Sequence, residues 1–537
     1  MLPKSTTPSG THFKGSGKAN LIFGLFLVVI TAYFIWWGLD YTNHQQVLLF
    51  IVATLFGIFM AFNIGGNDVA NSFGTSVGAG TLTIPQALAV AAIFEVSGAV
   101  IAGGEVTDTI RKGIVDLDAL GPAVTPNLFI YVMLSALIAA AFWLLFATKK
   151  GLPVSTTHSI IGGVVGSSVV MGIQIGGTET ALSTVQWSQV GEIAISWVLS
   201  PLLGGCLAYF LYGQIKSNIL SYNDRAEERV KELKAAKKAL KKRHKEWLNE
   251  LAETLQISYT SKMVRDQEIY KDEDTERDDL ETDYYQELFD IERERDSIDT
   301  LKALRNWVPL IAAFGGVVMT AMVVFKGLSN VNMTLTSLHG FLLMIMIGAL
   351  IWLTTYIYTK SIKGKQKEDL TRATFILFSW MQVFTAAGFA FSHGANDIAN
   401  AVGPFAAIMD VIRTNTIASE AAVPAPVMVT FGVALIVGLW FIGKEVIQTV
   451  GTNLAEMHPA SGFSAELSAA TVVMGASMMG LPVSSTHVLV GAVLGIGMVN
   501  KNTNWGLMKP IGLAWVITLP AAATMSMISY LILTNIF

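Results

Sequence analysis

Long apolar runs alternate with short polar stretches along most of this chain. About 20 apolar residues in a helix cross the hydrocarbon core of a bilayer, so each run predicts a transmembrane helix. The runs lie near residues 21–40, 46–64, 84–103, 127–148, 152–172, 188–213, 306–326, 337–359, 373–392, 425–443, 466–480, 481–500 and 510–535. We therefore expect an all-α polytopic membrane protein with about 12–13 transmembrane segments.

The composition agrees with this class and argues against others. The chain has 537 residues, of which 52% are hydrophobic and 14% are charged. Soluble domains carry about 25% charged residues, so a soluble globular protein is not expected. Cys206 is the one cysteine, which excludes a disulfide framework or a cysteine metal site. We expect no nucleic-acid partner.

One stretch, residues 214–305, has a different character. Its first part is basic from Lys231 to Lys245, and its second part is acidic from Asp266 to Asp299. Apolar residues recur in both parts at helical spacing, which predicts two amphipathic helices joined by an acidic linker and drawn together by opposite charge. This stretch is either a solvated spacer between the two membrane halves or a partner-binding or regulatory module.

The chain therefore divides into four parts. We expect an N-terminal tail with an extra helix (1–45), a first membrane half (46–213), a charged helical loop (214–305) and a second membrane half (306–537). Lys and Arg beside short loops mark the cytoplasmic side. Their positions predict a multi-pass protein of the plasma or inner membrane, with the N-terminus and the loop in the cytoplasm and the C-terminus outside it.

Two polar motifs occur twice at one spacing. A stretch containing Asn67 and Asp68 recurs around Asn396 and Asp397, and a Leu-Pro-Val-Ser-x-Thr-His stretch ends at His158 and again at His487. Both differences, 396 − 67 and 487 − 158, equal 329. A shared register across two motifs indicates an internal duplication. The predicted orientation makes the copies antiparallel, which gives an inverted-topology repeat with discontinuous helices, as in many secondary transporters.

The Leu-Pro-Val-Ser-x-Thr-His motifs have the composition of a helix start. Proline suits the first turn of a helix, and Ser and Thr cap it. A helix N-terminus favours an anion without requiring a basic residue, and two such ends facing each other would surround a tetrahedral oxyanion. The alternative is that the hydroxyls pack between helices. The candidate residues are Ser155, Thr156, Thr157, Ser484, Ser485 and Thr486.

The Asn-Asp-x-Ala-Asn motifs offer oxygen ligands. Carboxylate, amide and unwound backbone oxygens suit a hard cation, and a carboxylate in a membrane segment usually marks a site. The alternative is a structural aspartate that pairs with a buried basic residue. The candidate residues are Asp68, Asn71, Asp397 and Asn400.

Two further acids, Glu95 and Glu466, lie in predicted membrane segments. At the 329-residue offset stand Pro424 and Leu137, so neither glutamate has an acidic counterpart. This asymmetry favours a coupling or gating role, although interfacial exposure explains Glu466 equally well. His158 and His487 follow the hydroxyls, and we expect them to orient these or cap a turn rather than bind metal.

Together the motifs resemble the inorganic phosphate transporter (PiT) family. The resemblance rests on residues 65–78 and 394–404, on the two Leu-Pro-Val-Ser-x-Thr-His motifs, and on residues 94–95, 110–114 and 461–467. The sequence of residues 71–78 is more similar to that of the sodium-coupled members. The resemblance implies an inverted repeat, a central phosphate site, cation symport and a homodimer. It also assigns the family's site residues to the positions above and its membrane glutamates to Glu95 and Glu466.

We therefore predict a secondary-active importer of inorganic phosphate, not an enzyme, with Na⁺ as the coupling ion and no other cofactor. The six hydroxyls would hold phosphate, the Asp and Asn residues would hold the cation, and Asn67 and Asn396 would bridge the two. Coupling to H⁺, a metal–phosphate complex, another tetrahedral oxyanion and an anion channel are the alternatives. A hydrolase using Ser155, His158 and Asp68 is disfavoured, because the mirrored motifs do not suit a single nucleophile and base.

Overall fold

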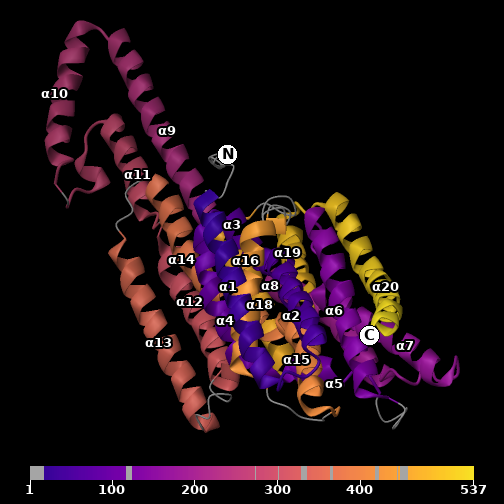
Figure 1. Cartoon of the computed structure of the whole chain (residues 1–537). Helices are drawn as coiled ribbons and strands as arrows, with labels where there is room; N and C mark the ends of the chain where they lie inside the picture. The colour runs from indigo at the N-terminus through magenta and orange to yellow at the C-terminus, as the bar shows by residue number, and fades with distance from the viewer. Residues whose placement is uncertain are drawn as a thin grey trace. The chain divides into compact units, whose positions relative to one another are not determined.

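The computed structural model describes residues 17–116, 124–272, 274–299, 301–327, 336–362, 367–417, 423–443, 446–447 and 457–537. Within these ranges the regular elements are helices, apart from one isolated β-bridge between Val115 and Val185 (Figure 1). The chain forms two compact units. One contains residues numbered within 1–213, 315–348 and 377–537, and the other contains residues within 214–314 and 349–376.

The first part of the chain forms the helices α1 to α8. Their bounds are α1 Gly17–Tyr41, α2 Val47–Ile64, a π-helical turn η1 Gly65–Val69, α3 Ala70–Gly78, α4 Ile84–Ala102, α5 Gly104–Lys112, α6 Pro126–Lys149, α7 Thr156–Gly176 and α8 Trp187–Ile215. The later part forms α12 Lys302–Met322, η5 Val323–Gly327, α13 Ser337–Ser361, α14 Lys367–Asp397, α15 Ala399–Thr414, α16 Ala425–Ile442, α18 Pro459–Met478, α19 Ser485–Asn500 and α20 Trp505–Ile536.

Eleven helical stretches among the described residues are long and apolar enough to cross a membrane. Each of the 13 apolar runs predicted above coincides with a helix of the structure. The two outside the set of 11 are α18 and α19, and α19 is only 16 residues long. The all-helical, multi-pass architecture is therefore confirmed, and the predicted number of 12–13 segments holds if at least one of α18 and α19 also spans.

The two membrane halves pack against each other in a reciprocal way. Gly65 contacts the backbone of Leu435 in α16, and its repeat mate Gly394 contacts the backbone of Glu95 in α4. A Cβ at either glycine would overlap the facing carbonyl oxygen, so the close approach requires glycine. The structural counterpart of Glu95 is therefore Leu435, 340 residues later, and not Pro424 as the 329-residue offset predicts. The conclusion that Glu95 has no acidic mate stands.

The second unit contains the charged stretch of the chain. Its helices are α9 Ser221–Glu250, α10 Glu253–Ile269 and α11 Asp283–Ser297, with short turns η3 Lys216–Leu220 and η4 Arg277–Asp279. Helices α9 and α11 pack together through Leu233, Leu240 and Leu288. Arg229 lies 2.6 Å from Glu294, and Lys237 pairs with Glu292. The predicted pairing of oppositely charged helices is observed, whereas α10 is a helix that the sequence reading placed in a linker.

Candidate functional site

Two asparagines hold the breaks that precede α7 and α19. Asn67 Nδ2 donates to Thr148 Oγ1 and to the Leu152 carbonyl, both at 3.0 Å, and Val154 N–H donates to Asn67 Oδ1 at 3.2 Å. Asn396 repeats each contact 329 residues later. Its partners are Ser477 Oγ, the Leu481 carbonyl and Val483 N–H, at 3.0, 3.1 and 3.2 Å. Both amides therefore fix the backbone of the extended segment in their own half.

The hydroxyl motifs form two helix starts that meet. Ser155 caps α7 and accepts from His158 N–H at 3.1 Å, and Ser484 caps α19 and accepts from His487 N–H at 3.2 Å. Thr157 Oγ1 donates across the halves to the Val483 carbonyl at 3.0 Å. Both motifs start helices as predicted, but Pro153 and Pro482 lie two residues before the N-caps, in the extended segment and not in the first turn. The contact between Thr157 and Val483 brings the N-terminal turns of α7 and α19 to one place, and each of these turns favours an anion.

The two aspartates lie directly against these helix starts. Asp68 Oδ2 accepts from Thr156 of its own half, and Asp68 Oδ1 accepts from Thr486 Oγ1 of the other half at 2.8 Å. Asp397 accepts from Ser485, the repeat mate of Thr156. All of these side chains are buried. The residues assigned to phosphate and those assigned to the cation thus form one hydrogen-bonded cluster rather than two separate groups.

Asn400 of the second half also bonds to the first half. Its Nδ2 donates to Thr156 Oγ1 at 3.1 Å and to Thr157 Oγ1 at 3.2 Å. Its repeat mate is Asn71, whose side chain lies outside the described residues. Among the described residues, Asn400 Oδ1, Asp397 Oδ1 and Glu95 Oε1 are buried oxygens with no hydrogen-bond partner. Unpartnered buried oxygens are costly, so they mark a place where a ligand can bind.

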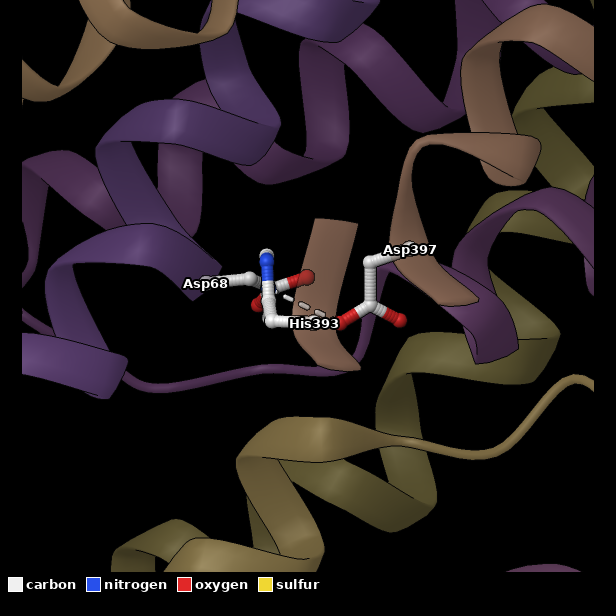
Figure 2. Close-up of side chains that lie close together, drawn as sticks. All are labelled: Asp68, His393 and Asp397. Carbon is white, nitrogen blue, oxygen red and sulfur yellow. Dashed lines mark ion pairs between the residues drawn. The ribbon is translucent and has the colours of Figure 1, made fainter. Parts of the chain in front are cut away.

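A histidine that the sequence reading left without a role occupies the centre of this cluster. His393 Nε2 lies 2.8 Å from Asp397 Oδ2, and His393 Nδ1 lies 2.7 Å from Glu95 Oε2. One ligand atom from each of Asp68, His393 and Asp397 lies within 4.8 Å of the others. Figure 2 shows that Asp68 and Asp397 approach this histidine from two different ribbons.

The pairing of His393 could have been anticipated in part. His393 stands four residues before Asp397, so the two share one helix face. The corresponding position in the first half is Ile64, and His393 therefore belongs to the asymmetric part of the site. Its contact with Glu95 could not be read from the sequence, because it depends on how α14 packs against α4.

Glu466 lies inside the protein, which makes the interfacial alternative wrong. Helix α18 begins at Pro459, almost two turns before Glu466, so the side chain is fully buried. Four neutral groups donate to its carboxylate. They are Thr75 Oγ1 at 2.7 Å, Thr385 Oγ1 at 2.9 Å, Gln382 Nε2 at 3.1 Å and the Ser76 hydroxyl. Thr75 and Ser76 lie on α3, and Asp68 lies in the preceding turn η1 of the same helical stretch, which connects the Glu466 carboxylate to the Asp68 segment.

The helical membrane fold and a buried polar site where the starts of α7 and α19 meet define a membrane transport protein. Residues 64–526 match the model of the phosphate transporter family, and the chain belongs to this family. The protein is accordingly a multi-pass membrane protein of phosphate transport, and its family and relatives are transporters or permeases rather than enzymes.

The relatives cover nearly the whole chain. A Mycobacterium bovis protein named "Putative phosphate permease Mb2302" is 57% identical over 99% of this chain and 96% of its own length. A Pyrococcus abyssi protein of similar name is 32% identical over 90% of this chain and 97% of its own length. A solved structure described as "The sodium-dependent phosphate transporter" is 30% identical, with a TM-score of 0.69, over 91% of this chain and all of its own.

Proposed function

We propose that this protein is a secondary-active symporter that imports inorganic phosphate together with a cation, and that the cation is Na⁺. The observation that carries the proposal is the set of unpartnered buried oxygens on Asp397, Asn400 and Glu95, beside hydroxyls at two helix N-termini. Oxygen ligands suit a hard cation, and helix N-termini suit an anion.

Charge explains why the two substrates would move together. Phosphate at the hydroxyls of Thr156 and Ser485 would lie next to Asp68 and Asp397, because these hydroxyls donate to the two carboxylates. Two like charges 4 Å apart repel by about 4 kcal/mol at an effective dielectric constant of about 20. A cation bound between them removes this repulsion. Phosphate therefore binds well only after the cation, which makes coupling obligatory without a fixed arginine.

The assignment of individual residues follows the sequence motifs. Phosphate would use the hydroxyls and the helix-end N–H groups of the two motifs. The cation would use Asp68, Asn71, Asp397 and Asn400. Asn67 and Asn396 were predicted to bridge phosphate and cation; their hydrogen bonds support a role in holding the extended segments before α7 and α19 in shape. Glu95 and Glu466, which lack mates, would serve coupling. Two observations favour Na⁺ over H⁺. The similar solved structure is described as a sodium-dependent phosphate transporter, and the sequence of residues 71–78 resembles that of sodium-coupled members of the family.

The remaining features of the proposal concern the assembly. We expect a homodimer in the plasma or inner membrane, with the N-terminus and the 214–305 loop in the cytoplasm and the C-terminus outside. These expectations rest on the family resemblance and on the positions of Lys and Arg. Labelling of single cysteines in sealed cells, in a variant with Cys206→Ser, tests the orientation directly.

The central experiment is radiolabelled phosphate uptake into proteoliposomes. Three conditions are compared: an inward Na⁺ gradient at equal pH, an inward H⁺ gradient without Na⁺, and no gradient. The proposal expects concentrative uptake in the first condition alone. Uptake in the second condition alone would assign H⁺ coupling, and equilibration without accumulation would indicate a channel. Adding a chelator of divalent cations distinguishes free phosphate from a metal–phosphate complex.

Variants then test the site. Asp68→Asn and Asp397→Asn are expected to abolish cation-driven uptake while the protein still inserts, because each removes a carboxylate that would bind the cation. Asp410→Asn is the matched control. Asp410 is also a buried aspartate, but it lies near the end of α15 and pairs with Arg413. Wild-type uptake in both site variants would overturn the assignment.

A further inference from the structure

Four aromatic rings contact one another in a row next to the two hydroxyl motifs, and we call this row the stack. The ring centroids of His158 and His487 are 4.6 Å apart, with the planes nearly perpendicular. Trp197 of α8 lies against His158 at 3.9 Å, and Trp515 of α20 lies against His487 at 3.8 Å. The order of the stack is therefore Trp197, His158, His487 and Trp515, and its centre is a contact between the two membrane halves.

Each tryptophan also binds the opposite half. Trp197 Nε1 donates to the Pro482 carbonyl at 3.2 Å, and Trp515 Nε1 donates to the Pro153 carbonyl at 3.1 Å. Pro153 and Pro482 are repeat mates in the extended segments that lead into α7 and α19. Each indole thus rests on the histidine of its own half and holds the break of the other half. Parting the halves here would break both hydrogen bonds and the ring contact together.

The stack is symmetric, unlike the residues assigned to coupling. His158 and His487 correspond at the 329-residue offset, and both tryptophans make the same two contacts. Glu95, His393 and Glu466 have no such mates. A symmetric contact at the junction of inverted repeats suits a movement in which one half moves against the other, which is how such transporters expose their site to alternate sides.

The stack also lies next to the site, and two of its buried ring nitrogens lack hydrogen-bond partners among the described residues. His158 directly follows Thr157, and His487 directly follows Thr486. Both imidazoles are buried, and among the described residues neither Nε2 has a hydrogen-bond partner. A buried polar atom without a partner raises the free energy of the conformation that contains it. This closed arrangement is therefore destabilised relative to one in which water or phosphate reaches the imidazoles.

We propose that Trp197, His158, His487 and Trp515 form a four-ring gate, which closes the phosphate site at the starts of α7 and α19 and opens when the two histidine rings separate. The proposal rests on the proposed phosphate site at the hydroxyl motifs. The tryptophans are positioning residues, since they act through the histidines and the proline carbonyls. The gate sets how fast phosphate passes and not which cation accompanies it.

The test is efflux of radiolabelled phosphate from preloaded proteoliposomes without any cation gradient. The double variant Trp197→Ala/Trp515→Ala is expected to release phosphate about tenfold faster than wild type, the change given by a barrier about 1.4 kcal/mol lower. The KM for phosphate should stay near the wild-type value. Trp143→Ala is the matched control. Trp143 Nε1 donates to Thr518 Oγ1 at 3.0 Å, and its ring lies outside the stack.

Two outcomes would overturn the gate. One is wild-type efflux from the folded double variant, and the other is a strongly raised KM for phosphate whatever the efflux rate, which would make the rings part of the binding site. If the double variant does not fold, His158→Ala carries the test, since it removes one central ring and keeps both indole hydrogen bonds. Wild-type efflux from that variant would also refute the gate. The proposed function is tested separately: it is wrong if the wild-type protein shows no gradient-driven uptake.

Discussion

Gly394 is the position where one added methyl group should disturb the site most directly. It lies in α14 between His393 and Asn396, and it packs against the backbone of Glu95 in α4. A Cβ at residue 394 would lie 2.8 Å from the Glu95 carbonyl carbon, and nearer still to its oxygen. Ordinary contacts of this kind begin at 3.4 Å, so Gly394→Ala must part the two helices by at least about 0.6 Å.

That displacement is large relative to the hydrogen bond it would affect. His393 Nδ1 and Glu95 Oε2 are 2.7 Å apart, and adding about 0.6 Å gives about 3.3 Å, beyond the usual range for a hydrogen bond. Overpacking alone costs about 1–3 kcal/mol, and breaking a buried pair costs about 3–5 kcal/mol. Because His393 also contacts Asp397, we expect Gly394→Ala to lower phosphate uptake about 100-fold.

The assay combines uptake into proteoliposomes with the thermal unfolding midpoint in detergent. Gly475→Ala is the matched control, since Gly475 lies inside α18 and a Cβ there would meet no atom within 4 Å. The control is expected to keep both uptake and midpoint. A Gly394→Ala protein that transports and unfolds like wild type would refute the argument that this backbone contact positions His393.

Three further predictions concern other parts of the chain. Asn67→Leu should lower stability by about 1–3 kcal/mol, seen as a lower unfolding midpoint, because Val154 N–H loses its acceptor. Asn63→Leu should lower the midpoint less, because among the described residues the Asn63 amide donates to the Phe59 carbonyl of its own helix and to no other group. Glu466→Gln should reduce uptake per folded protein, since the amide removes the charge that four donors face; unchanged uptake would make Glu466 purely structural. Asp266→Ala should expose the α10–α11 connection to limited proteolysis and cost about 1–3 kcal/mol, because Asp266 accepts from the N–H groups of Glu281 and Thr282; a wild-type cleavage pattern would contradict this.

The close relation of the two halves explains why much could be predicted. The 329-residue offset identified both broken segments, and the structure shows them with matching contacts at Asn67 and Asn396. Proline followed by Ser and Thr predicted the starts of α7 and α19, since helix capping is a local property. Helix α18 was placed less well. Its small and polar residues between Pro459 and Glu466 do not form an apolar run, so its first two turns were missed.

The sequence by itself determined the class of the protein, the duplicated motifs and the chemical types of the site residues. These depend on the length of apolar runs, on local capping and on spacing along one chain. Tertiary structure alone decided which groups meet. Thr486 donates to Asp68, 418 positions earlier, Glu95 pairs with His393, and Trp515 holds Pro153 of the other half. Such contacts depend on how helices from the two halves cross, and periodicity within one helix carries no information about the partner that packs against it.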